Sequence, residues 1–82
     1  MLRVDKFIKA TNIVKKRSIA QDMCENGVVS INGVMAKASK EVKIGDIIEL
    51  KYLERIKKFK VLKIPVLKNV RKSEIQEYVS EI

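Results

Sequence analysis

The fold is decided by residues 15–33, KKRSIAQDMCENGVVSING, which predict a short helix followed by a tight hairpin. Ser18 is the expected N-cap of this helix, and Gln21, three residues later, completes a capping box. Gly27 suits the left-handed position that ends a helix, and Asn32-Gly33 is the strongest short-range signal for a two-residue hairpin turn. The helix would bury one apolar stripe, made of Ile19, Ala20, Met23 and Cys24.

A second helix is predicted just upstream, in the segment that begins RVDKFIK at residue 3. Its apolar stripe recurs at helical spacing and consists of Val4, Phe7, Ile8 and Thr11. Arg3, Lys6 and Lys9 fall on the other faces of the same helix. Because both helices are too short to be stable alone, they must pack against another part of the chain.

The rest of the chain has the pattern of a small antiparallel sheet. Strands are expected at 28–31 and 34–36 around the hairpin turn, at 46–52, and at about 55–64, where Pro65 stops the last one. From Ser73 the helical period returns, with Ser73 and Gln76 as a second possible capping box. Its stripe is Ile75, Tyr78, Val79 and Ile82. We therefore expect an α+β fold in which two N-terminal helices pack on a small, mainly antiparallel sheet, with a short C-terminal helix.

Charge and composition narrow the function classes. The 82 residues suffice for one domain, and the net charge of +8 is shared by both halves of the chain, as a surface that binds a polyanion requires. Without histidine and with a single cysteine, the chain offers no internal disulfide and no expected metal or cofactor site. Cys24 is interpreted as a small buried hydrophobe, with a reactive thiol as the alternative.

Enzymes and membrane proteins fit this sequence poorly. It has no paired carboxylates at a plausible site and no glycine-rich loop that would cradle a phosphate, so we expect a protein that is not an enzyme. No apolar run is long enough to span a membrane and no signal peptide is recognised, which predicts a cytoplasmic protein without membrane contact.

The motifs, taken in order, resemble a known family. They are the opening Arg-x-Asp-Lys-Phe, the Lys-Arg-Ser before the second helix, the Gly-x-Val-x-Ile-Asn-Gly hairpin and the later Val-x-x-Gly-Asp. Over residues 2–52 the chain resembles the S4-type (alpha-L) RNA-binding domain, first defined in ribosomal protein S4. Its size and short tail are most similar to the heat-shock fifteen-kilodalton and ribosome-associated quality-control protein P families. We assign residues 1–64 to the RNA-binding domain and 65–82 to a C-terminal extension with a short amphipathic helix.

The resemblance implies a function and a set of partners. Such relatives bind the large ribosomal subunit after it has split with a peptidyl-tRNA attached, and support C-terminal tailing of the nascent chain together with a tailing factor. We accordingly expect contacts with ribosomal RNA and peptidyl-tRNA, by a monomer. The alternative is a generic module that binds structured RNA or another protein and has no role in tailing. The family motifs place the RNA-binding group at Arg3, Asp5, Lys6, Lys16 and Arg17, to which we add Lys9, Lys15, Ser18, Asn32 and Lys37.

The chemistry of these positions supports phosphate binding independently of the resemblance. Arg17 and Ser18 stand where the second helix begins, and free N–H groups at a helix N-terminus favour an anion. Arg17 offers a planar fork for phosphate, whereas Lys16 is a point charge. Asp5 either orients a neighbouring cation or accepts a hydrogen bond from RNA. Asn32 either contacts RNA or is present because it tolerates a positive φ.

Two further features have alternative interpretations. The basic run at 55–63 either extends the RNA footprint or protects a sheet edge from aggregation. The tail helix either packs back on the domain or docks on a partner. Only 5% of the residues are aromatic, and Phe7 lies on the apolar stripe. Recognition of RNA shape is therefore favoured over base stacking.

Overall fold

The computed structural model describes residues 2–65 and 70–82. Its elements in chain order are β1 (Leu2–Arg3), α1 (Val4–Ala10), α2 (Arg17–Glu25), β2 (Val29–Ile31), β3 (Val34–Met35), β4 (Glu41–Val42), β5 (Ile47–Lys51), β6 (Ile56–Val61), the 3-10 turn η1 (Lys72–Glu74), α3 (Ile75–Tyr78) and β7 (Val79–Glu81). None of the helices in these residues has the length and apolar character that crossing a membrane requires.

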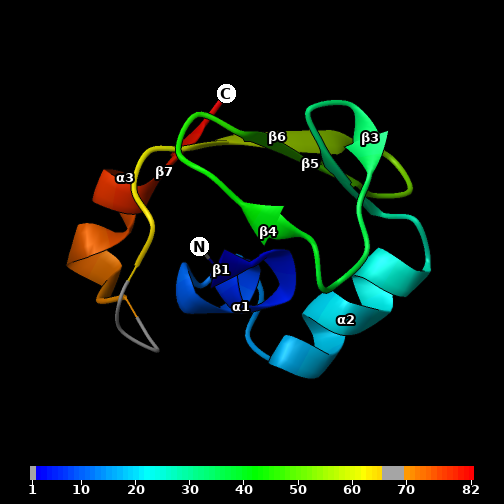
Figure 1. Ribbon diagram of the computed structural model, residues 1–82, viewed down its shortest axis with the longest axis horizontal. Helices are drawn as coiled ribbons and strands as arrows, with labels where there is room; N and C mark the ends of the chain where they lie inside the picture. Colours follow the sequence, from blue (N-terminus) through cyan, green and yellow to red (C-terminus); the bar gives the residue numbers. More distant parts are fainter. Residues whose placement is uncertain (1, 66–69) are drawn as a thin grey trace.

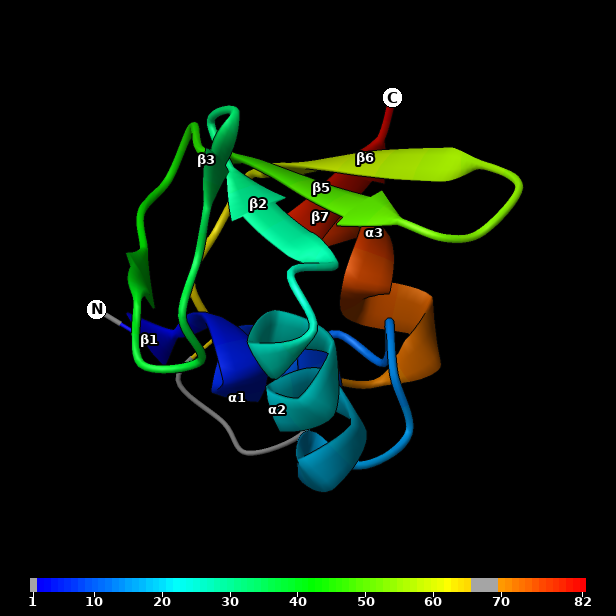
Figure 2. The same cartoon turned by 90° about the vertical axis from the view of Figure 1, so that its right-hand side faces the viewer.

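Two antiparallel sheets organise the chain. The larger has the order β3-β2-β5-β6-β7, and the smaller pairs β1 with β4. Helices α1 and α2 contact each other and lie against one face of the larger sheet, while α3 lies at its side (Figures 1 and 2). This arrangement confirms the expected α+β class.

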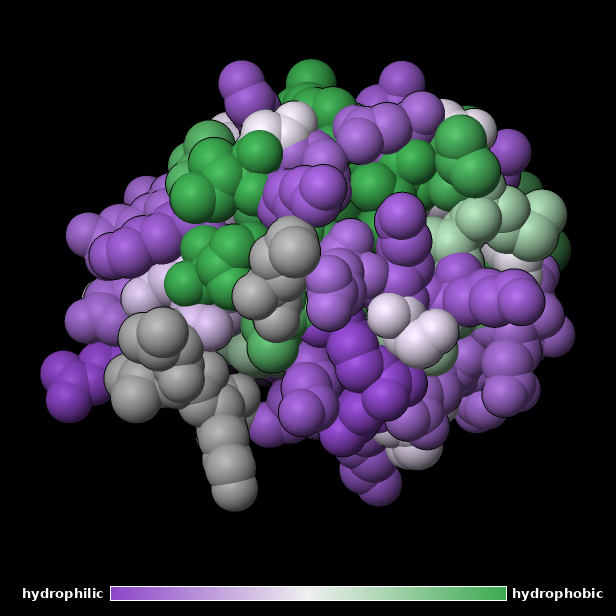
Figure 3. All heavy atoms as spheres, viewed as in Figure 1, coloured by the Kyte–Doolittle hydropathy of each residue, from purple (hydrophilic) through white to green (hydrophobic). Residues whose placement is uncertain are grey.

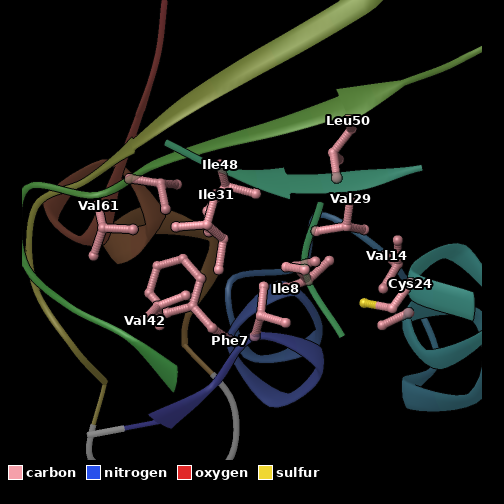
Figure 4. Close-up of a cluster of buried hydrophobic side chains, with 14 residues drawn as sticks. Phe7, Ile8, Val14, Cys24, Val29, Ile31, Val42, Ile48, Leu50 and Val61 are labelled. Atoms are coloured by element: carbon pink, nitrogen blue, oxygen red, sulfur yellow. The ribbon is translucent and has the colours of Figure 1, made fainter. Parts of the chain in front are cut away.

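The core lies between α1 and the larger sheet. Phe7 and Ile8 of α1 point toward the strands in Figure 4 and are fully buried, as are Ile48 and Leu50 of β5. All four residues of the apolar stripe predicted for this helix are buried, namely Val4, Phe7, Ile8 and Thr11. Burial of such side chains contributes about 1.5–3 kcal/mol each relative to exposure, so this contact fixes where α1 sits.

Helix α2 differs from its prediction in two respects. It begins at Arg17 with Lys16 as N-cap, and no side chain caps it, so the expected Ser18–Gln21 capping box is wrong. Ile19 is 44% exposed and does not belong to the buried stripe, whereas Ala20 and Cys24 do. The C-terminal end is as predicted, because Gly27 follows the C-cap Asn26 with a φ of +72°.

The tail is the largest difference from the sequence-based expectation. Helix α3 ends at Tyr78, and residues 79–81 form β7, which pairs with β6 through Phe59–Glu81 and Val61–Val79. Ile82, assigned to the helical stripe, is 70% exposed, and neither η1 nor α3 has a side-chain cap, so the second capping box is also wrong.

Strand β7 also changes the interpretation of the basic run at 55–63. β5 pairs with Ile56–Lys60 of β6, whereas β7 pairs on the other side only with Phe59, Lys60 and Val61. Edge protection is therefore wrong for this second half of β6 and stays a prediction for residues 55–57. The boundary proposed after residue 64 stays a prediction, although the pairing of β6 with β7 ties the extension to the larger sheet.

The small sheet determines where α1 begins, and it was not predicted from the sequence. Leu2 pairs with Val42 and Arg3 with Glu41. The first N–H groups of α1 are satisfied from the same region, because Val4 N donates to the carbonyl of Lys40 at 2.7 Å and Asp5 N to that of Ala38 at 3.4 Å. The loop after β3 is thus attached to the start of α1.

The hairpin prediction is confirmed. Asn32 and Gly33 have φ values of +52° and +82°, and Ile31 pairs with Val34 across them. Two successive positive φ values define the turn type whose twist matches that of the strands.

Replacement of Gly33 by Val is expected to lower the free energy of unfolding by about 1–2 kcal/mol. A Cβ at this position would contact nothing within 4 Å, so the cost comes from the backbone alone. For a domain of this size that corresponds to a fall in Tm of roughly 4–16 °C in circular dichroism melts. Gly33→Asn, which tolerates a positive φ, should recover most of the loss, and an unchanged Tm for Gly33→Val would contradict the turn.

Candidate nucleic-acid interface

The carboxylate of Asp5 is the centre of the candidate site. Its side chain is completely buried. Oδ2 accepts hydrogen bonds from Arg17 Nε at 3.1 Å and Gln21 Nε2 at 3.2 Å, and Oδ1 accepts from the backbone N–H of Lys6 at 2.8 Å. A buried carboxylate with this many donors is a positioning group for the cations around it. We call Arg3, Asp5, Arg17 and Gln21 the Asp5 cluster.

The two arginines of the cluster are held differently. Arg17 donates from Nε with hydrogen-bond geometry, whereas Arg3 Nε lies 3.3 Å from Oδ1 as an ion pair without such geometry, and its Nη2 donates to Oδ2 at 3.4 Å. The side chains remain 40% exposed for Arg17 and 42% for Arg3. Each guanidinium is thus oriented from the protein side and open to solvent on the other.

The cluster keeps Asp5 ionised. Burial alone would raise the pKa of Asp5, but hydrogen bonds from Gln21, Arg17 and the Lys6 N–H, together with the charge of Arg17, outweigh it and hold the pKa below its ordinary value. At neutral pH the cluster therefore contains one buried negative charge beneath two positive ones.

The lowered pKa predicts how stability depends on pH. Asp5 contributes stability that is complete above its unfolded pKa of about 3.8 and is lost as the pH falls through the lower folded pKa. We expect wild type to have a higher Tm than Asp5→Asn at neutral pH, and the difference to shrink below pH 3.8. Melts of both proteins from pH 7 to pH 2 measure this. A difference that stays constant with pH would mean that folding does not lower the pKa of Asp5.

The other predicted site residues are distributed around this cluster. Lys16 is the N-cap of α2 and Lys6 follows Asp5 on α1, while Lys9 lies one turn further along α1 and is half-buried. Five of these residues are exposed on the surface, namely Lys6, Lys15, Lys16, Ser18 and Lys37. Lys37 belongs to the loop whose carbonyls cap α1, so it lies in the same region as Arg3.

Asn32 has a structural role. Besides its positive φ, its amide donates from Nδ2 to Asp46 Oδ1 at 3.1 Å and accepts from Ile47 N at 3.0 Å. These bonds fasten the hairpin to the turn before β5. Of the two interpretations of Asn32, the structure supports the turn residue, and contact with RNA stays a prediction.

Gln21 was missed as a site residue, because it was assigned to the capping box. The spacing of four between Arg17 and Gln21 places both on one face of α2. That face meets α1 at Asp5, so a single buried carboxylate joins residues from two helices.

Cys24 lies outside the cluster and is buried. Burial raises the pKa of its thiol, and the negative charge of Asp5 adds to the effect. This favours the interpretation as a buried hydrophobe over a reactive thiol.

The surface around the helices is strongly polar. On the face shown in Figure 3, hydrophilic side chains dominate the lower half, over α1 and α2, whereas hydrophobic ones gather over the sheet. A polar helical edge that carries oriented arginines can contact phosphates along the ridges of folded RNA without reading many bases.

Comparison with known proteins identifies similar chains. The S4 domain model matches residues 2–48. The RQC P-site tRNA stabilizing factor of Helicobacter pylori is 48% identical over 79 residues, which are 96% of this chain and 94% of that protein.

Two solved structures are similar over nearly the whole chain. The trimeric structure of Vibrio cholerae heat shock protein 15 has a TM-score of 0.88 at 36% identity, covering 99% of this chain and 81% of that one. A solution structure of a hypothetical protein has a TM-score of 0.87 at 47% identity, covering 99% and 96%.

Proposed function

The chain belongs to the S4 domain family, as its motifs predicted, and from this premise we propose that it binds structured RNA through the Asp5 cluster and the surrounding lysines. The observation that carries this proposal is the buried carboxylate beneath two half-exposed arginines. Solvated surface cations need no such support, whereas cations that must meet a phosphate at a fixed place benefit from it.

We further propose that the bound RNA belongs to the large ribosomal subunit and to a peptidyl-tRNA on it. The name of the Helicobacter relative states that it stabilises P-site tRNA in ribosome-associated quality control, and that protein matches this chain over almost its full length. The chain would then act in the cytoplasm as a binding factor for stalled, split subunits, and support tailing of the nascent chain by a separate factor rather than catalyse a reaction itself.

The proposal is tested by purifying the tagged protein from cells with stalled translation. We expect it to travel with split large subunits that carry peptidyl-tRNA, and the Arg17→Ala variant to be depleted from them. Migration of the wild-type protein as a free species would contradict a ribosomal role and favour a generic RNA-binding or protein-binding module. Loss of C-terminal tails in a strain that lacks the gene distinguishes support of tailing from subunit binding alone.

Binding is expected to depend steeply on salt. Each neutralised phosphate contributes a slope of about −0.7 to −0.9 in a plot of log K against log salt, and roughly four to seven contacts give a total of about −3 to −6. Titrations of a structured RNA at several salt concentrations measure the slope. A flat response would contradict recognition through phosphates.

A further inference from the structure

A hollow of about 580 Å³ is lined by the end of β2 and by the segment that runs from β3 through β4 to the turn before β5. Figure 2 shows the course of this segment's backbone. Its apolar lining includes Ile31, Val34, Met35 and Ala36. The volume falls within the range of about 300–1,000 Å³ typical of small-molecule sites. The hollow therefore has room for a group the size of a nucleotide.

Two of the four apolar residues of the lining are exposed, whereas Ile31 and Ala36 are buried. Val34 and Met35, which form the edge strand β3, are each 70% exposed. Apolar side chains that are exposed together around a hollow mark an interaction site more often than scattered ones do.

Cations surround this apolar surface. Lys37, Lys40 and Lys43 line the hollow and are exposed. Two acids, Glu41 and Asp46, also line it, so the three lysines leave a net charge of +1 around the hollow. The oxygens of Asp46 accept hydrogen bonds from Asn32 Nδ2 and from Lys43 N at 2.8 Å. The charge around the hollow favours an anion with an apolar part.

The hollow is fixed in place and adjoins the Asp5 cluster. The carbonyls of Ala38 and Lys40 accept the first N–H groups of α1, and Asn32 fastens the hairpin to the turn before β5. Glu41, on the wall of the hollow, pairs in register with Arg3 of the cluster. An RNA strand seated on Arg3 and Arg17 would therefore pass close to the opening.

We propose that this hollow holds one unpaired nucleotide of the bound RNA, with its base against Val34 and the neighbouring apolar lining and its flanking phosphates on the three lysines. The proposal rests on the proposed function and adds a base contact to recognition by shape. A nucleotide satisfies both parts of the lining, since its base has an apolar face and its phosphates carry the negative charge. A purely apolar protein segment would leave the lysines without partners.

The test uses two RNA hairpins with the same stem and a single bulged position, occupied by 2-aminopurine in one and by an abasic sugar in the other. Both have the same number of phosphates, so electrostatics alone predicts equal affinity. Contact with a base contributes about 1–3 kcal/mol where aromatic rings stack on it. For an aliphatic lining we expect the lower end, a preference of about fivefold for the RNA with the base. The fluorescence of 2-aminopurine should also change on binding.

The Val34→Arg variant distinguishes binding of a base in the hollow from nonspecific electrostatic attraction. The arginine fills the opening, so we expect the affinity for the RNA with the bulged base to fall to that for the abasic RNA, and the preference to disappear. The added positive charge acts on both RNAs alike. Ile44→Arg is the matched control, because Ile44 is 67% exposed, lies in the adjacent turn and does not line the hollow. It should keep the preference.

Equal affinity of the wild type for both RNAs, with a steep salt dependence, overturns the nucleotide site and leaves the proposed function in place. A preference for the bulged base that survives in Val34→Arg also overturns the site, because the base would then be bound elsewhere. The hollow would in that case be free to take a protein segment. Binding to neither RNA overturns both proposals.

Discussion

Replacement of Asp5 by Ala is expected to weaken RNA binding by about ten- to a hundredfold, although it raises the net charge of +8 by one unit. Bulk electrostatics predicts tighter binding from such a change. The structure predicts the opposite, because Arg3 and Arg17 both lose the carboxylate that orients them. A loss of about 1.5–3 kcal/mol is typical of hydrogen bonds to charged groups.

Asp22→Ala provides the matched control for this experiment. Asp22 is an exposed carboxylate on α2, so its removal changes the net charge equally without touching the cluster. It should bind RNA as well as wild type or slightly better, in titrations at one stated salt concentration. Asp5→Asn keeps the shape of the side chain and should lose affinity as well, which guards against simple unfolding of Asp5→Ala. Equal affinities of the Asp5 and Asp22 variants would refute a positioning role for Asp5.

Local sequence signals predicted most of the fold. The helical spacing of Val4, Phe7 and Ile8 identified α1, because these three side chains must leave water together. The Asn32-Gly33 turn was predicted equally well, since few residue pairs other than Asn-Gly readily adopt positive φ values at both positions. In both cases the preference of a few neighbouring residues agrees with the tertiary structure.

The tail shows where such signals fail. The stripe from Ile75 to Ile82 is compatible with a helix, yet residues 79–81 pair with β6 instead. The edge of β6 presents a row of N–H and C=O groups, and a strand can pair with that row where a short helix cannot. Val79 is buried in β7 and also lies on the apolar stripe of the predicted helix, so its hydrophobicity did not discriminate between the two conformations. The competing interaction is nonlocal and leaves no periodic trace in the sequence.

The site was predictable in composition but not in geometry. Its basic residues are visible in the sequence, whereas the convergence on Asp5 involves Arg17 and Gln21, at separations of 12 and 16 residues. The capping-box pattern then assigned Gln21 to the wrong partner. Only the packing of α1 against α2 shows that Asp5 is buried and accepts hydrogen bonds from Arg17 and Gln21.

Replacement of Arg17 by Ala should cost about 1.5–3 kcal/mol of binding free energy, a loss of roughly ten- to a hundredfold in affinity. Its Nε is occupied by Asp5, which aims the planar end of the guanidinium outward for a phosphate. Lys63→Ala removes the same charge from a residue whose Nζ lies 5.4 Å from the ring centre of Tyr78, and it should cost much less. Both variants are compared on large subunits that carry peptidyl-tRNA, after melts show that each is folded. If Lys63→Ala weakens binding as much, the basic run at 55–63 belongs at the centre of the interface.

A double-mutant cycle then decides whether Asp5 acts through Arg17. If Asp5 contributes by aiming this guanidinium, removing Asp5 from a protein that already lacks Arg17 should cost far less than removing it from wild type. The two losses would then fall short of additivity by about 0.5–3 kcal/mol, the range found for residues in one network. The loss of binding free energy that removal of Asp5 still causes in the Arg17→Ala protein measures what Asp5 does through Arg3. Because the bonds of Arg3 to Asp5 are the longer ones, we expect that remainder to be the smaller share. Full additivity would mean that the carboxylate and Arg17 affect RNA independently, despite the 3.1 Å hydrogen bond between them.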